Sequence, residues 1–195
     1  MTKNVLVNGT ETNLTLPNGF KVVSIDYEQR NQEQVKIIRY QENDKIQYDN
    51  AHVTLVFGSD ERLISYNNVA VNNRNIDTLP SESEALKIAS QTFKKIDPQY
   101  AAGLTFMRID HLTRYFTNAQ GNRIDIPIDW VKFAHTNGSY NWVSVGPDGV
   151  IIEFERESYW DYSDGRRATE AWNYDDWVKA RRGEGPQLPA PQALA

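Results

Sequence analysis

Short runs of alternating apolar and polar positions occupy most of the chain, and this period-two pattern predicts β-strands. Two turn sequences separate such runs in the first third, Asn8-Gly9 and the four residues at 58–61. The pattern returns after residue 103 and is interrupted by turns at 118–122 and 146–149. We predict strands at residues 5–7, 14–16, 20–27, 35–40, 52–57, 63–66, 104–109, 112–116, 128–134, 140–145 and 150–155.

A different period marks residues 82–96, where apolar side chains recur every three or four positions, as on one face of a helix. Ser81 and Glu84 form a capping box, in which each side chain bonds the backbone N–H of the other residue. The residue before Pro98 disfavours the α conformation, so the helix should end there. The sequence therefore predicts a helix at Glu82–Ile96. Acidic residues followed by basic ones predict a shorter helix at 172–182.

These elements predict an α+β fold: an antiparallel sheet of two related β units, with one main helix packed on it and a short C-terminal helix. We divide the chain into an N-terminal β unit at 1–78 and a helix-plus-sheet unit at 79–157. An aromatic C-terminal arm follows at 158–182. Because glycine and proline are frequent after it, residues 183–195 are expected to form a flexible tail.

The two β units share a short repeat. Residues 58–66 align without gaps on residues 146–154, and each copy has an aspartate in its turn and ends in an aromatic residue, Tyr66 or Phe154. Hairpins often converge on such patterns, so both duplication and convergence stay open.

Two segments resemble a known family. Residues 79–89 (LPSESEALKIA) look like the opening helix of a PepSY domain, and residues 141–154 look like its closing hairpin, with Pro147-Asp148-Gly149 at the turn. PepSY domains occur in propeptides of thermolysin-like proteases and in bacterial envelope proteins. The resemblance implies a helix on a small antiparallel sheet, and protein binding or protease inhibition without catalytic residues.

Composition narrows the possible partners and locations. The chain has 195 residues, 39% of them hydrophobic, and no cysteine, which excludes disulfides and thiolate chemistry. Its net charge of −5 argues against nucleic-acid binding. No apolar run approaches the ~18 residues of a membrane helix, so membrane insertion is not expected. The lack of a signal sequence predicts a cytoplasmic protein, or an envelope or secreted one if a leader has been removed.

Catalytic and metal-binding motifs are not evident. His52, His111 and His135 occur without a Gly-x-Ser-x-Gly or His-Glu-x-x-His motif. Asp125 and Asp129 would share one face of a strand, an arrangement open to the paired acids of a glycosidase. We assign no catalytic residue, no metal site and no cofactor.

The aromatic residues of the last third are the most informative candidates. All five tryptophans lie there, and Trp130 and Trp142 fall on predicted strands and are expected in the core. The aromatic arm either packs back across the sheet or lines a groove for a ligand. The candidate ligand-binding residues are Trp160, Tyr162, Trp172 and Trp177.

The sequence therefore predicts a non-enzymatic, PepSY-like module that binds a protein or peptide, with protease inhibition as one form of that binding. A free sheet edge could also accept a partner strand. The alternative is a small-molecule or carbohydrate-binding domain, or a hydrolase, that uses an aromatic and acidic groove. The oligomeric state is not predicted.

Overall fold

The computed structural model describes residues 2–70 and 78–195. Its central feature is an antiparallel eight-stranded sheet in the order β3-β4-β5-β6-β10-β9-β8-β7, so that β3 and β7 are the edge strands. The strands are β3 Lys21–Arg30, β4 Glu33–Gln41, β5 Val53–Phe57, β6 Leu63–Asn68, β7 Leu104–Thr117, β8 Arg123–His135, β9 Tyr140–Val145 and β10 Ile151–Ser158.

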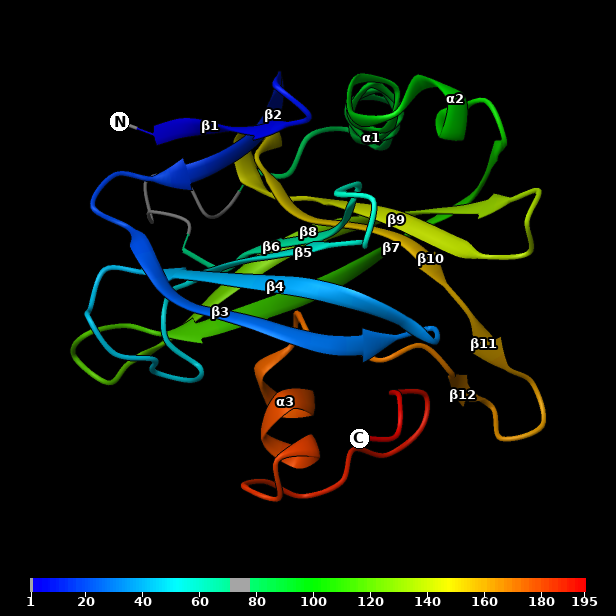
Figure 1. Ribbon diagram of the computed structural model, residues 1–195. Helices are drawn as coiled ribbons and strands as arrows, with labels where there is room; N and C mark the ends of the chain where they lie inside the picture. The colour runs from blue at the N-terminus through cyan, green and yellow to red at the C-terminus, as the bar shows by residue number, and fades with distance from the viewer. Residues whose placement is uncertain (1, 71–77) are drawn as a thin grey trace.

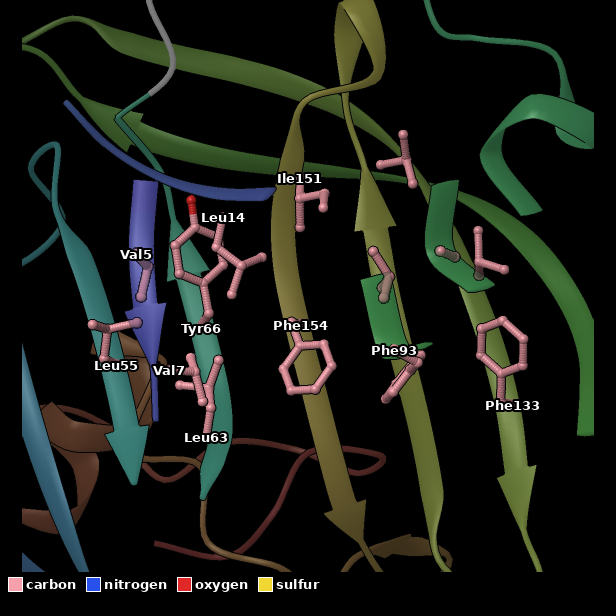
Figure 2. Close-up of a cluster of buried hydrophobic side chains, with 14 of the residues drawn as sticks. Val5, Val7, Leu14, Leu55, Leu63, Tyr66, Phe93, Phe133, Ile151 and Phe154 are labelled. Carbon is pink, nitrogen blue, oxygen red and sulfur yellow. The ribbon is translucent and has the colours of Figure 1, made fainter. Parts of the chain in front are cut away.

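One face of the sheet is covered by a hairpin and two helices (Figure 1). The hairpin is β1 (Thr2–Val7) with β2 (Thr10–Pro17), and the helices are α1 (Glu82–Ile96) and α2 (Pro98–Ala101). Figure 2 shows the resulting core, in which Phe93 of α1 lies over the sheet. Its ring centroid is 4.8 Å from that of Phe154 and 5.5 Å from that of Phe133. We call this side the α1 face.

The opposite face is covered by the C-terminal part of the chain and is called the α3 face (Figure 1). The short ribbon β11 (Trp160–Asp161) with β12 (Arg166–Arg167) leads to α3 (Asp175–Arg181). A second core lies under α3, where Trp177 is 1% exposed and packs with strand residues such as Ile37 and Ile64.

The last residues of the chain differ from the flexible tail expected at 183–195. They turn back towards α3, and Ala193 is 2% exposed in the second core. The Trp177 indole N–H donates to the Leu194 carbonyl (3.1 Å), and the Arg167 N–H donates to the Pro191 carbonyl (2.9 Å). This segment is therefore part of the packed structure.

The predicted main helix is confirmed with its bounds. Ser81 accepts a hydrogen bond from the Glu84 N–H, and the Glu84 carboxylate accepts one from the Ser81 N–H, which completes the capping box. Asp97 ends α1 in an extended conformation and caps α2, which begins at Pro98. The shorter predicted helix at 172–182 corresponds to α3.

The predicted α+β fold is wrong. The protein is mostly β, with 48% of its residues in strands and 16% in helices. One 15-residue helix covers only part of the α1 face, and the β1–β2 hairpin covers the rest. The eight strands of the main sheet, not a helix packed on small sheet units, define the architecture.

β7, β8 and β10 are longer than predicted, whereas β9 has the predicted bounds of 140–145. β7 runs without a break from Leu104 to Thr117, although its sequence reads as two short strands. Many of its side chains are exposed because it is an edge strand, so charged residues interrupt the apolar pattern. Pro127 lies in a part of β8 that pairs with β7 alone, because β9 pairs with β8 only from Asp129 to Ala134, and proline is tolerated where a strand has a neighbour on one side only.

The sequence repeat occupies equivalent places in the sheet. Residues 58–66 contain the β5–β6 turn and most of β6, and residues 146–154 contain the β9–β10 turn and the first half of β10. The two terminal aromatics, Tyr66 and Phe154, are directly opposite in the antiparallel pairing of β6 with β10. Each half contributes a four-stranded meander, and the two meanders meet at this pair.

No helix in the parts of the chain that the structure describes is long and apolar enough to cross a membrane.

Candidate functional site

The residues predicted to bind a ligand lie in two places. Trp172 and Trp177 belong to the second core, where their rings meet edge to face with centroids 4.8 Å apart. The Trp172 indole N–H donates to the Gln29 carbonyl at 2.8 Å. Because the Trp177 N–H is bonded to the C-terminal segment, a ligand would reach the Trp177 ring only if that segment moved away.

Trp160 and Tyr162 lie on the β11–β12 ribbon and its connecting turn. Trp160 is half-buried, whereas Tyr162 is 76% exposed. The Tyr162 hydroxyl contacts the Tyr140 hydroxyl of β9. The exposed ring therefore lies at the border of the sheet's α3 face and stays a candidate for ligand contact.

The histidines do not form a nucleophile–base pair. His135 stacks on Tyr100 with ring centroids 4.0 Å apart, and its Nδ1 accepts a hydrogen bond from the Asn137 N–H. The nearby Ser139 hydroxyl donates instead to the Asn137 side chain at 2.7 Å. Because neither ring nitrogen of His135 contacts this hydroxyl, His135 and Ser139 do not act as base and nucleophile in this geometry.

The other two histidines have structural partners. His52 is fully buried, and its Nδ1 lies 2.7 Å from the Asn50 carbonyl. Burial lowers the pKa of His52, so the buried ring is neutral. His111 is exposed, and its Nδ1 lies 2.7 Å from Oδ1 of the buried Asp129.

Asp125 and Asp129 are not a catalytic carboxylate pair. They are four residues apart along β8, which places their backbones about 13 Å from each other. Asp125 is exposed and accepts a hydrogen bond from Arg123 at 2.6 Å, whereas Asp129 is buried against His111. Because each carboxylate is held by a different side chain, the two do not act together as the paired acids of a glycosidase.

Two further carboxylates of β10 are fully buried on the α3 face. Glu153 accepts hydrogen bonds from Arg114 (2.6 Å), Ser144 (2.5 Å) and Tyr174 (3.1 Å). Burial would raise the pKa of Glu153, but the charge of Arg114 and these hydrogen bonds outweigh it, and the pKa lies below its ordinary value. An acid catalyst needs the opposite shift, so Glu153 is a structural carboxylate.

Glu155 is held between two arginines. Its Oε1 accepts from Arg30 at 2.8 Å and from Arg167 at 2.7 Å, and the Arg30 and Glu155 side chains are 3% and 1% exposed. The pair ties β3, β10 and β12 together. Within the described residues, no group of three or more His, Asp or Glu side chains is placed to hold a metal ion.

An aromatic and cationic group occupies the α3 face of β8 and β9, beside the region that α3 covers. Val131 and Val143 point into the core on the α1 face. Their neighbours in each strand must point the other way, because side chains alternate along a strand. Trp130 and Lys132 of β8 and Tyr140 and Trp142 of β9 therefore share the α3 face; with Arg108 of β7 and Tyr162 we call them the aromatic–cationic surface.

Lys132 lies at the centre of this surface. Its Nζ is 4.3 Å from the ring centroid of Tyr140 and 5.1 Å from that of Trp130. The Trp130 ring meets Trp142 edge to face at 5.4 Å. Arg108 lies 5.9 Å from Trp130 and donates to Asp110 at 2.7 Å, so this arginine already has a carboxylate partner.

Lys132 lacks such a partner: no described side chain forms a hydrogen bond or ion pair with its ammonium group. Burial, together with the charge of Arg108, lowers the pKa of Lys132, and Asp110 opposes this effect. The buried indole nitrogens of Trp130 and Trp142 also have no hydrogen-bond acceptor among the described residues. The Lys132 ammonium beside these aromatic rings thus lacks a counter-charge among the described residues, which suits the surface to a ligand with a carboxylate and an apolar group.

A separate polar hollow of about 1060 Å³ lies between β2, the β4–β5 connection and the 3₁₀ turn η1 (Pro147–Gly149). About half of its lining residues carry amide or hydroxyl side chains, among them Asn13, Asn50 and Asn68. Ala70 also lines it, and the residues directly after Ala70 lie outside the described part of the chain. We therefore assign no ligand to this hollow.

No protein-family model and no curated protein matches the chain. The chemistry of its surfaces therefore carries the functional argument.

Sequence reasoning placed Trp130 and Trp142 in the core and did not single out Lys132 or Tyr140. Trp142 is 6% exposed, whereas Trp130, Lys132 and Tyr140 are half-buried around a common surface. The signal in the sequence is the alternation Trp130-x-Lys132 in one strand and Tyr140-x-Trp142 in the next. That signal becomes informative only when β8 and β9 are known to be neighbours, with Lys132 opposite Trp142.

Proposed function

We propose that the protein is a non-catalytic binding module that holds a segment of another protein at the aromatic–cationic surface. The observation that carries the proposal is Lys132, a half-buried cation between two aromatic rings without an anionic partner among the described residues. A ligand carboxylate would supply the missing counter-charge, and an apolar ligand side chain would lie against Trp130.

Two further points support binding rather than catalysis. The buried acids Glu153 and Glu155 are paired with arginines, and His135 is stacked on Tyr100, so these groups serve the structure. The resemblance of residues 79–89 and 141–154 to PepSY domains points to the same class of function, protein binding with protease inhibition as one form of it.

The test is an NMR titration with a pool of short peptides that combine acidic and aromatic residues, compared with a pool in which glutamine and asparagine replace the acids. We expect backbone and indole signals of Trp130 and Trp142 to shift with the acidic pool. Lys132→Gln should weaken binding about five- to tenfold, which corresponds to about 1–1.4 kcal/mol. Lys95→Gln, which removes an exposed cation of α1, is the matched control and should bind like the parent protein.

A stability measurement separates a binding role from a structural one. Because burial disfavours the charge of Lys132, Lys132→Gln should leave the denaturation midpoint nearly unchanged while it weakens binding. Equal binding of both pools, or no effect of Lys132→Gln on binding, would contradict the proposal. Shifts caused by a neutral oligosaccharide but not by the acidic pool would favour a carbohydrate-binding function instead.

A further inference from the structure

The two edge strands of the sheet are long and lack a neighbouring strand along most of their outer sides. β3 spans Lys21–Arg30, and β7 spans Leu104–Thr117. Each edge also exposes large apolar side chains: Ile25 (52%) and Tyr27 (63%) on β3, and Phe106 (43%) on β7. Soluble proteins usually protect such edges with proline, inward-pointing charge or a covering segment.

Both edges are closed at one end only. On β3 the Gln29 carbonyl accepts the Trp172 indole N–H, so the C-terminal arm occupies the last part of the strand. On β7 the Thr117 N–H donates to the Asp49 carbonyl at 2.6 Å. On their outer sides, residues 21–28 of β3 and 104–116 of β7 have no strand beside them in the described chain.

The outer side chains of β3 alternate between apolar and acidic. Ile25 is opposite Ile38, which packs against the core of the α1 face, so Ile25 and Tyr27 lie on that face. Asp26 is opposite Ile37 of the second core, so Asp26 and Glu28 lie on the α3 face. This edge is apolar on the α1 face and negative on the α3 face.

The outer side chains of β7 complement this pattern. Phe106 and Ile109 are opposite Phe133 and Val131 of the first core, so they lie on the α1 face. Arg108 is opposite Lys132 and lies on the α3 face, where its side chain is 52% exposed. This edge is therefore apolar on the α1 face. On the α3 face it is positive, because Arg108 has Lys132 of β8 as its neighbour and Asp110 offsets only part of their charge.

Strand direction is also compatible. Every neighbouring pair in the eight-stranded sheet is antiparallel, so β3 and β7, at the first and last places, run in opposite directions. A second molecule placed beside the first in the same orientation would continue the sheet with an antiparallel β3–β7 pair, with its α1 face on the same side.

From this match of pattern, charge and direction, we propose that the β3 edge of one molecule pairs with the β7 edge of a second copy. Asp26 and Glu28 then face Arg108, and Ile25 and Tyr27 meet Phe106 and Ile109. The contact joins two different surfaces, so it extends head to tail or closes into a ring. A single strand pair buries less area than a permanent dimer, so the association is weak and reversible.

The experiment uses the full chain and one variant blocked at each edge. Sedimentation over a wide concentration range should show reversible self-association of the parent protein. Arg108→Glu should block the β7 edge, and the double change Asp26→Arg with Glu28→Arg should block the β3 edge; each should weaken association about tenfold or more. Lys95→Glu on α1 is the matched control for charge and should associate like the parent.

The most direct test is to mix the two blocked variants and to measure their association. An equimolar mixture of the two blocked variants contains two complementary contacts, one between the unchanged edges and one between the charge-reversed edges, so it should associate although neither variant does so alone. Combining all three changes in one chain should restore self-association through reversed charges. Hydrogen exchange should slow in β3 and β7 as concentration rises, with no change in the central strands β6 and β10.

Three results would overturn the inference: a parent protein that stays monomeric at millimolar concentration, blocked variants that associate like the parent, or blocked variants that do not combine when mixed. Circular dichroism and the denaturation midpoint confirm that each variant is folded. The double change Asp26→Arg with Glu28→Arg lies at the opposite edge of the sheet from Lys132 and should leave binding of the acidic peptides unchanged, so failure of this inference and failure of the proposed peptide binding can be told apart.

Discussion

Tyr66 of β6 and Phe154 of β10 are directly opposite each other at the junction of the two four-stranded halves of the sheet. Both are fully buried on the α1 face, but different elements cover them (Figure 2). The Tyr66 hydroxyl donates to the Thr15 carbonyl of β2 at 2.8 Å, whereas the Phe154 ring packs against Phe93 of α1. The aromatic residue with a hydroxyl therefore lies in the half of the sheet that β2 covers, where the Thr15 carbonyl accepts its hydrogen bond.

Exchanging these side chain types tests that relationship. Tyr66→Phe should lower the free energy of unfolding by about 1–2 kcal/mol, because the Thr15 backbone loses its partner. Phe154→Tyr should cost about 1–3 kcal/mol, because a hydroxyl is forced under α1. Urea denaturation of both variants checks this. Two unchanged midpoints would mean that neither covering element selects its aromatic residue.

The C-terminal segment should stabilise the protein. Deleting residues 184–195 removes the buried Ala193 and the acceptor of the Trp177 N–H, so we expect a loss of about 2–3 kcal/mol and a red-shifted tryptophan emission. Leu194→Ala is the control, because its side chain is 54% exposed and only its carbonyl is used. If the truncated protein unfolds at the parent midpoint, the segment does not contribute to the second core.

Acid should destabilise the fold partly through Glu33. Hydrogen bonds from Arg62, and further ones from Ser59, lower the pKa of Glu33 from 4.5 to about 2 against the opposing effect of burial. Because the folded-state pKa is the lower one, this contribution is fully present above about pH 4.5 and disappears as the pH falls towards 2. Denaturation midpoints measured across this window should fall less steeply for Glu33→Gln than for the parent. Parallel curves would contradict the prediction.

Breaking the buried ion pairs of Glu155 should be costly. Glu155→Ala leaves Arg30 and Arg167 without their carboxylate, and we expect a loss of about 3–5 kcal/mol. Replacing all three side chains with apolar ones of similar size should recover most of that loss, since a buried ion pair adds little beyond good packing. If Glu155→Ala alone is neutral in thermal denaturation, water must compensate both arginines.

The sequence alone determined the local elements. Glu82–Ile96 was predicted with its bounds, because the capping box at Ser81 and Glu84 and the break at Pro98 act through neighbouring residues. The turn at Asn8-Gly9 was predicted for the same reason, and both of its residues have positive φ. The alternating runs predicted most strands, but the polar edge strand β7 was divided in two.

Only the tertiary structure decided how these elements combine. Strand order, the junction at Tyr66 and Phe154, and the grouping of Trp130, Lys132 and Tyr140 depend on contacts between residues far apart in the chain. The fate of residues 183–195 was decided in the same way, because their glycine and proline content excludes helix but does not exclude packing against Trp177. Local pattern fixes backbone conformation, whereas burial depends on which surface a segment meets, and the free energy of that contact is not encoded in any single segment.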